Sequence, residues 1–215
     1  MKKLLAVILL LLAGTAWGGD FEDGNAAYQK RDYSVAISKY KLAAEQGNFM
    51  AQYNVGNMYN NGEGVVQDYA EAVKWYKLAA AQGTDRAQFS IGNMYLAGKG
   101  VVQDYAEAAK WYKLAAAQGF EYAQLNIGNM YYDGLGVEKN YAEALKWYKL
   151  AAAKGNAKAQ KQIDVIMFAN ERNQCYKACQ RKLTECVISY KSAANEVCGM
   201  PSYNCNQRCD SIGLK

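Results

Sequence analysis

The stretch NFMAQYNVGNMYNNGEGVVQDYAEAVKWYKLAAAQG spans Asn48–Gly83, and two near-copies follow it without a gap, Thr84–Gly119 and Phe120–Gly155. The tetrapeptide Gly-Asn-Met-Tyr and the octapeptide Lys-Trp-Tyr-Lys-Leu-Ala-Ala-Ala occupy the same positions in each 36-residue copy. A repeat period between about 20 and 50 residues is typical of solenoids, in which each unit covers its apolar face by stacking on its neighbours. The repeat therefore decides the fold.

Each copy has the pattern helix, loop, helix. In the first copy we expect one helix from about Met50 to Tyr59 and a second over Tyr69–Ala81, separated by the breaker Gly62-Glu63-Gly64. Asp68 stands where a helix N-cap belongs, and Gly83 stands just past the end of the second helix. The predicted fold class is an all-α solenoid of helix pairs.

Small residues and aromatic residues recur inside the predicted helices. Ala51 and Gly56 are expected where another backbone comes close, and Glu71 is expected to pair with Lys74 on a solvated face. We interpret the tryptophans and the tyrosines that follow them as packing between repeats. They are Trp75, Trp111 and Trp147, with Tyr76, Tyr112 and Tyr148.

The motif in these copies resembles the Sel1-like repeat, a relative of the tetratricopeptide repeat. The resemblance rests on Ala51-x-x-x-Val55-Gly56-x-x-Tyr59, on Gly62-x-Gly64-Val65-x-x-Asp68, and on Ala72-x-x-Trp75-Tyr76-x-x-Ala79-Ala80-x-x-Gly83. The third copy has Asn140 at the aspartate position, and asparagine can still cap a helix. Upstream, Tyr28–Ala43 looks like a tetratricopeptide-type helix pair, and downstream Ala157–Phe168 looks like a final first helix without its partner.

The first eighteen residues have the pattern of a secretory signal peptide. Lys2 and Lys3 precede the apolar run Leu4–Leu12, and small residues follow, so cleavage is expected after Gly18 or after Ala16. The alternative is an uncleaved anchor, but the apolar run is short for a membrane span. With the family resemblance, this pattern predicts export, to a Gram-negative periplasm or as a secreted protein.

Six cysteines lie after the repeats, with spacings of 4, 7, 12, 7 and 4 residues that form a mirror image. Offsets of 4 and 11 residues return to nearly the same helical face, so the pattern predicts an antiparallel helical hairpin joined by nested disulfides. The expected pairs are Cys175–Cys209, Cys179–Cys205 and Cys186–Cys198. A zinc site and a redox-active pair are the alternatives, although zinc usually takes closer cysteine pairs and Cys-x-x-Cys is absent.

The expected domain organisation follows from these features. It consists of a signal peptide at 1–18, a tetratricopeptide-like pair at 19–47, Sel1-like repeats at 48–83, 84–119 and 120–155, a terminal helix at 156–170 and a cysteine-rich helical hairpin at 171–215.

Composition excludes several kinds of chemistry. The 215 residues contain no histidine, so no Ser-His-Asp triad, Cys-His pair or HExxH zinc site can form. The formal charge is +5 without a basic run that would suggest nucleic acid. The glycines of Gly62-x-Gly64 lack the ending of a phosphate-binding loop. We expect no cofactor and no metal.

The resemblance implies that the first helices of the pairs line a concave groove that binds a partner. Matching Gly56 to the small residue of a tetratricopeptide helix places four groove positions on each first helix. They are Met50, Tyr53, Asn57 and Asn60, then Arg86, Phe89, Asn93 and Leu96, then Tyr122, Leu125, Asn129 and Tyr132. An asparagine amide suits an extended peptide backbone, so the series Asn57, Asn93 and Asn129 is either a row of ligand contacts or a structural feature of duplicated repeats.

The sequence therefore predicts a non-enzymatic module that binds a protein or peptide in the groove. The first alternative is an inhibitor or immunity-type protein that masks a toxic or lytic enzyme. The second is a hydrolase of β-lactam or cell-wall amides. The β-lactam-binding activity associated with secreted cysteine-rich relatives is not carried over, because this chain has no cysteine in its repeats.

Overall fold

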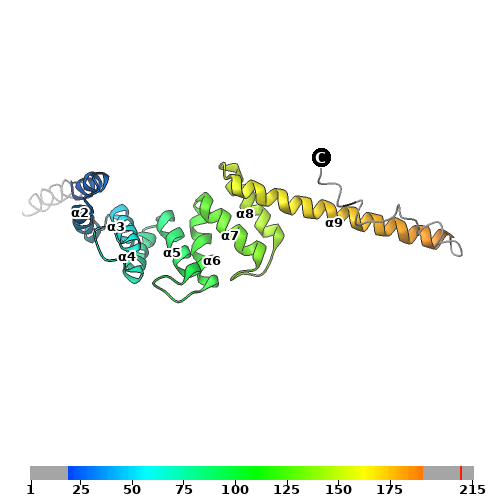
Figure 1. Ribbon diagram of the computed structural model, residues 1–215, viewed down its shortest axis with the longest axis horizontal. Coiled ribbons are helices and arrows are strands. Elements are labelled where there is room, and N and C mark those ends of the chain that lie inside the picture. Colours follow the sequence, from blue (N-terminus) through cyan, green and yellow to red (C-terminus); the bar gives the residue numbers. More distant parts are fainter. Residues whose placement is uncertain (1–18, 191–208, 210–215) are drawn as a thin grey trace, which may run out of the picture. The chain divides into compact units, whose positions relative to one another are not determined.

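The computed structural model describes residues 19–190 and residue 209. The predicted signal peptide and most of the second arm of the predicted hairpin lie outside these residues. Within the described part, all regular secondary structure is helical, as predicted (Figure 1). None of the helices in this part is long and apolar enough to cross a membrane.

Nine helices cover the described residues. The first spans residues 19–29. The others are α2 (Tyr33–Glu45), α3 (Phe49–Asn61), α4 (Tyr69–Ala81), α5 (Asp85–Ala97), α6 (Tyr105–Ala117), α7 (Glu121–Asp133), α8 (Tyr141–Ala153) and α9 (Ala157–Tyr190). The chain divides into two compact units after Asn156.

The helix ends in the repeats follow from local chemistry. Helix α4 has the predicted bounds, whereas α3 begins one residue earlier and ends two residues later than predicted. The Asp68 carboxylate accepts hydrogen bonds from the backbone N–H groups of Ala70 and Glu71, at 2.9 and 3.0 Å. Asp104 caps α6 and Asn140 caps α8, which confirms the predicted N-caps.

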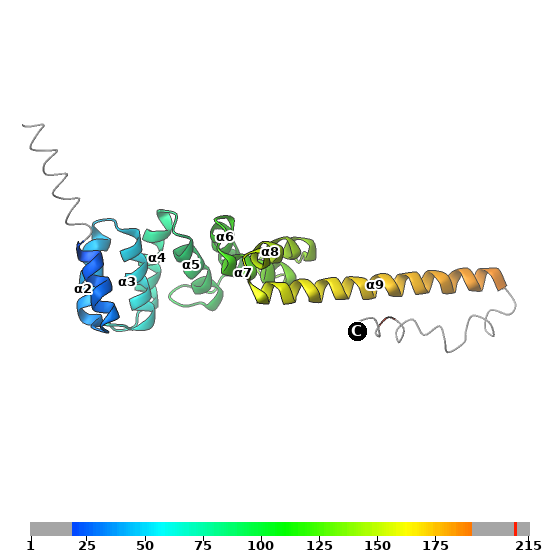
Figure 2. The same cartoon turned by 90° about the horizontal axis from the view of Figure 1, so that it is seen from above.

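In the first unit, consecutive helices from α2 to α8 lie side by side (Figures 1 and 2). Three successive clusters of buried alanine, aliphatic and tyrosine side chains form the core. Trp75 of α4 packs against the first cluster, which combines Ala27 and Tyr40 of the preceding helix pair with Val55 and Met58 of its own repeat. Trp111 and Trp147 pack in the same way on the next two clusters. Glu71 and Lys74 form the expected surface ion pair at 2.7 Å.

At Gly56, as expected, a backbone comes close: a β-carbon there would lie 3.3 Å from the carbonyl oxygen of Ala72. The loop glycines meet a neighbouring backbone more closely still. Gly64 has a φ of 71°, and a β-carbon there would collide with the backbone of Tyr33 at the start of α2. Only glycine tolerates both the positive φ angle and the close contact with a neighbouring backbone without strain. Gly100 and Gly136 meet the starts of α4 and α6 in the same way.

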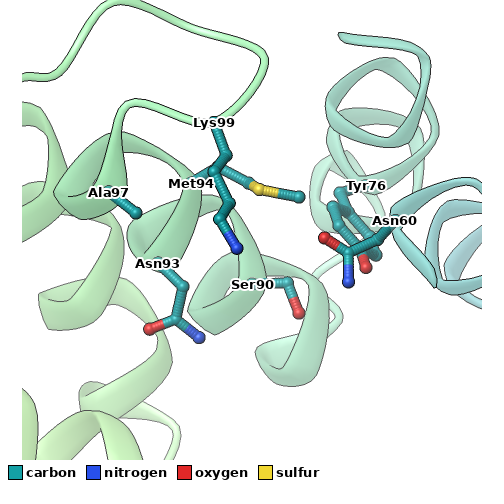
Figure 3. A pocket seen from close by; sticks show the side chains of 7 residues that line it. All are labelled: Asn60, Tyr76, Ser90, Asn93, Met94, Ala97 and Lys99. Carbon is teal, nitrogen blue, oxygen red and sulfur yellow. The ribbon is translucent and has the colours of Figure 1, made fainter. Parts of the chain in front are cut away.

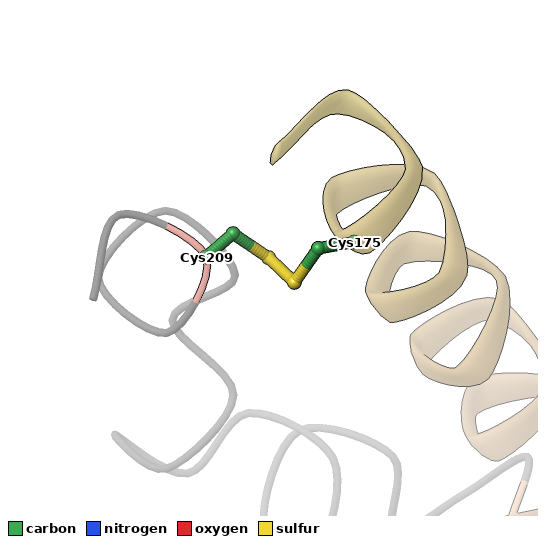
Figure 4. The surroundings of a disulfide bond; sticks show 2 residues. All are labelled: Cys175 and Cys209. Carbon is green, nitrogen blue, oxygen red and sulfur yellow. A yellow bond between two sulfur atoms is a disulfide. The ribbon is translucent and has the colours of Figure 1, made fainter. Parts of the chain in front are cut away.

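The second unit is dominated by α9, a continuous helix of 34 residues. It contains both the expected terminal helix and the first arm of the expected hairpin, with no break near residue 170. Cys175 on α9 forms a disulfide with Cys209, with their Cα atoms 5.8 Å apart, as predicted (Figure 4). Cys179 is also disulfide-bonded. Cys198 and Cys205 lie outside the described residues, so the two inner pairings stay predictions.

Replacing the cap aspartates should destabilise the first unit. Asp68→Ala and Asp104→Ala each remove acceptors for N–H groups in the first helical turn, and each should lower the free energy of unfolding by about 0.5–2 kcal/mol. Thr84→Ala is the matched control, because the Thr84 side chain makes no capping hydrogen bond at the start of α5. Denaturant unfolding measures all three, and an equal loss in Thr84→Ala would contradict the capping role.

Peptide mapping without reduction should recover Cys179 linked to Cys205 and Cys186 linked to Cys198. Both links extend the mirror pattern in which Cys175 bonds to Cys209. A peptide that joins Cys179 to Cys186 would show that the nested arrangement is wrong.

Candidate functional site

The predicted groove positions lie on one face of α3, α5 and α7, but they differ in exposure. The first position of each helix is exposed, at 49% for Met50 and 53% for Tyr122, and Arg86 is exposed as well. Tyr53 and Phe89 are half-buried, whereas Leu125 at 9% exposure belongs to the core. The side chains most accessible to a partner are therefore those at the first groove position of each helix.

The asparagine series has a structural partner in every repeat. The Tyr76 hydroxyl donates a hydrogen bond to the Asn57 Oδ1 at 2.8 Å. Tyr112 donates to Asn93 at 2.7 Å, and Tyr148 donates to Asn129 at 2.8 Å. The carbonyl oxygen of each amide is thus used inside the repeat, so any ligand would meet the amide N–H groups.

The glycine before each asparagine makes room for the same tyrosine. A β-carbon at Gly56 would lie 2.6 Å from two ring carbons of Tyr76, closer than packing allows. The same holds for Gly92 under Tyr112 and for Gly128 under Tyr148. In each Gly-Asn dipeptide, the glycine therefore leaves room for the tyrosine ring, and the asparagine accepts a hydrogen bond from the tyrosine hydroxyl.

A fourth such contact lies in the N-terminal helix pair, where the sequence analysis did not find it. The Tyr40 ring covers Gly24, and its hydroxyl donates to the Asn25 Oδ1 at 2.8 Å. The sequence feature that could have indicated this contact is the dipeptide Gly24-Asn25, which matches Gly56-Asn57. Its tyrosine follows the glycine by 16 residues instead of the 20 that separate Gly56 and Tyr76, because the connecting loop is shorter.

The tyrosine hydroxyls also connect successive repeats. Asn54, Ser90 and Asn126, on the first helix of the next pair, lie close enough to Tyr40, Tyr76 and Tyr112 respectively to lower the tyrosine pKa against the rise that burial causes. Burial raises the pKa of Tyr112 to about 12, and Asn126 partly offsets this rise. Each tyrosine is therefore a protonated bridge between neighbouring first helices.

Two clefts lie beside these bridges. The first, of about 390 Å³, is lined by Asn25, Tyr28, Tyr40, Tyr53, Asn54, Asn57 and Arg86. The second, of about 240 Å³, is lined by Asn60, Tyr76, Ser90, Asn93, Met94, Ala97 and Lys99. Figure 3 shows Asn60 and Tyr76 on one side of the second cleft and Ser90, Asn93 and Lys99 on the other.

The clefts bring together some of the predicted residues. Tyr53, Asn57 and Arg86 line the first cleft, and Asn60 and Asn93 line the second. The remaining predicted positions line neither of the two: Met50, Phe89, Leu96, Tyr122, Leu125, Asn129 and Tyr132. Phe89 and Tyr122 instead form an aromatic group with Phe120. Lys99 and Ser90 were missed, although Ser90 follows Arg86 by one helical turn and so shares its face.

A Ser-x-x-Lys sequence occurs once in the chain, at Ser38–Lys41 on α2, and bears on the hydrolase alternative. Ser38 is exposed. The Lys41 Nζ donates to the Tyr59 hydroxyl at 2.7 Å and lies 5.0 Å from the centre of the Tyr59 ring. The lysine is therefore engaged by Tyr59, and it does not hydrogen-bond Ser38.

Tyr112→Phe should lower the free energy of unfolding by about 0.5–1.5 kcal/mol at neutral pH, because the hydroxyl bonds are lost. It should also reduce the dependence of stability on alkaline pH. Between pH 10 and 12 the phenol of the unfolded chain ionises while the folded Tyr112 keeps its proton, so this part of the stability is present below pH 10 and lost as the pH rises to about 12. Denaturant unfolding at several pH values measures both effects, and an identical alkaline loss in parent and variant would contradict the assignment.

The family model of the Sel1 repeat matches residues 19–48, 49–84, 85–120 and 121–156. The last three ranges begin one residue after the expected repeats. The first shows that the N-terminal pair, likened above to a tetratricopeptide pair, is itself a Sel1 repeat. No sequence among the curated proteins is a match.

The solved structures that are similar to this chain include two proteins with Sel1-type repeats. A Sel1 repeat protein from Oxalobacter formigenes is 41% identical, with a TM-score of 0.56, and the alignment covers 60% of this chain and 96% of that one. The second is c5321, described as a protective antigen present in uropathogenic Escherichia coli strains and displaying an SLR fold. It is 31% identical, with a TM-score of 0.68, over 91% of this chain. This chain spans only 46% of the length of c5321.

The four matched ranges cover more than half of the chain, and the tyrosine, glycine and asparagine contacts recur in each of them. The protein belongs to the Sel1 repeat family.

Proposed function

We propose that this protein is a non-enzymatic module that holds a protein or peptide partner along the first helices of its repeats. Sel1 repeats form a scaffold typical of protein-binding modules. The observation that carries the proposal is the contrast between two sets of residues on these helices. The glycine and asparagine that support the tyrosine bridge are the same in each repeat, whereas the exposed residue on the same face is Met50, Arg86 or Tyr122.

This contrast is what a binding surface on a rigid frame requires. The bridges use the inner positions to hold the helices in register, so substitutions there would disturb the stack. The side chains at the exposed positions lie outside the buried core, although Tyr122 also contacts Phe89 and Phe120, and they differ from repeat to repeat. Side chains held on packed helices also lose little conformational entropy when a partner binds.

The proposed site of action is outside the cytoplasm. The disulfide between Cys175 and Cys209 supports this, since disulfides persist in oxidising compartments. The signal-peptide pattern of residues 1–18 supports it independently. The periplasm of a Gram-negative cell is the proposed location.

Site-specific photocrosslinking tests which face binds. A photoreactive residue at Met50, Arg86 or Tyr122 should crosslink a partner in extracts of cells that naturally make the protein, because these positions point out of the groove face. The matched controls are Leu78, Leu114 and Leu150. These leucines recur once per repeat on the second helices and are 49–51% exposed, so they equal the groove positions in number and exposure.

The expected result is a discrete crosslinked partner from the groove positions and none from the leucines. Crosslinks from the leucines alone would move the binding surface to the second helices and contradict the proposal. The parent protein should compete for the partner, which separates binding from random capture.

A further inference from the structure

Positive charge on the groove face is concentrated on one helix. Arg86 lies in the first turn of α5, and Lys99 lies two residues past its end. The equivalent positions in the first repeat are Met50 and Glu63, and those in the third repeat are Tyr122 and Leu135. The second repeat therefore differs from its two near-copies by carrying a cation at both ends of its first helix.

Both cations open onto the clefts described above. Arg86 lines the first cleft, and Ser90, Asn93, Ala97 and Lys99 line the second (Figure 3). The helical positions 86, 90, 93 and 97 fall on one face of α5, since residues three or four apart are neighbours on a helix. Helix α3 contributes to both clefts as well, through Tyr53 and Asn57 in one and Asn60 in the other. The two clefts are thus parts of one surface along α3 and α5.

The groups that line this surface are mainly hydrogen-bond donors. No aspartate or glutamate lines either cleft. The carbonyl oxygens of Asn57 and Asn93 already accept from tyrosine hydroxyls, so these two amides present N–H groups. Tyr53, Ser90 and the two cations add further donors.

The nearby acidic groups have other partners or lie apart from the cations. The Asp85 carboxylate accepts from the backbone N–H of Arg86 at 2.7 Å, and Glu63 accepts from the Tyr28 hydroxyl at 2.9 Å. In the part of the chain that the structure describes, no carboxylate lies within 4.0 Å of the Arg86 guanidinium or the Lys99 amine. Lys99 lies 5.1 Å from the centre of the Tyr69 ring, a contact that leaves its charge uncompensated. Both cations are therefore available to an anionic ligand.

The length of α5 sets the spacing of the charges in such a ligand. From Arg86 to the end of α5 at Ala97 the chain advances about 16 Å at 1.5 Å per residue, and Lys99 lies two residues further on, so the two cations are roughly 20 Å apart. An extended peptide advances about 3.3 Å per residue, so it covers this span with about six residues. Its backbone carbonyls would meet the amide N–H groups between the two cations.

We propose that the surface along α3 and α5 binds an extended acidic peptide segment, with carboxylates about six residues apart that pair with Arg86 and Lys99. This inference rests on the proposed function and names the partner chemistry for its second repeat. Carboxylates are recognised by guanidinium and ammonium groups through charge-assisted hydrogen bonds, which are about twice as strong as neutral ones.

Fluorescence anisotropy with a labelled peptide tests the proposal on the full chain. The probe is Asp-Ser-Ala-Gly-Ser-Ala-Asp with both ends blocked, and the comparison peptide has asparagine in place of both aspartates. The acidic peptide should bind about tenfold more tightly than its amide analogue, because two exposed ion pairs of about 0.7 kcal/mol each together contribute about 1.4 kcal/mol. Moving the two aspartates next to each other should weaken binding.

Charge-removing variants locate the contact. Arg86→Gln and Lys99→Gln should each weaken binding of the acidic peptide about three- to tenfold and leave the amide analogue unaffected. Lys110→Gln is the matched control, because it removes one exposed positive charge that is paired with Glu107 on a second helix. It should leave binding unchanged, and circular dichroism should show equal helicity in all variants.

Two outcomes would overturn the inference: equal binding of the acidic peptide and its amide analogue, or an equal loss in Lys110→Gln and Arg86→Gln, which would indicate non-specific attraction. Absence of binding by either peptide would also overturn it. The photocrosslinking result does not depend on peptide charge. Crosslinks at Met50 and Tyr122 together with failure of the acidic peptide would therefore leave the proposed function standing and remove only the acidic partner.

Discussion

The stack depends on a tyrosine ring that lies over a glycine of the adjacent helix and donates its hydroxyl to the asparagine that follows the glycine. This contact occurs four times, at Tyr40, Tyr76, Tyr112 and Tyr148. A buried ring supplies a large apolar area, and its hydroxyl must find a partner because an unpaired buried polar group is costly. The glycine allows the close approach and the asparagine supplies the acceptor, so neither residue can be changed without cost to the other side of the contact.

A second constraint fixes how one repeat follows another. The loop glycine Gly64 and its equivalents lie against the backbone at the start of the preceding second helix, with positive φ angles. The tyrosine hydroxyls reach across to Asn54, Ser90 and Asn126 on the next first helix. Each repeat is thus joined to its neighbour at its loop and along its first helix. The tyrosine contacts occupy the inner positions of the groove face, which are Asn57, Asn93 and Asn129. The exposed positions Met50, Arg86 and Tyr122 take no part in these hydrogen bonds and vary between repeats.

The three near-copies differ in the charge that their first helices carry. The three near-identical repeats share their frame, yet only the second carries Arg86 and Lys99 on the groove face. The clefts beside it gather amide and hydroxyl donors without a carboxylate. Arg86 and Lys99 differ from their counterparts in the other copies and form no ion pair within the described residues, so they are the positions at which we propose that a partner is selected.

The sequence by itself determined the helix pairs, their N-caps, the solenoid and the Cys175–Cys209 disulfide, because these follow from periodicity, capping chemistry and spacing along one chain. It also placed Asn57, Asn93 and Asn129 on a common face. Only the tertiary structure decided what that face does. The tyrosines that engage those amides come from the second helix of the pair, and Lys99 and Ser90 share a cleft with Asn60 and Tyr76 only when the second repeat stacks on the first. Contacts between helices depend on how aromatic rings and loops from different helices are placed in space. No local sequence pattern encodes the distances between them.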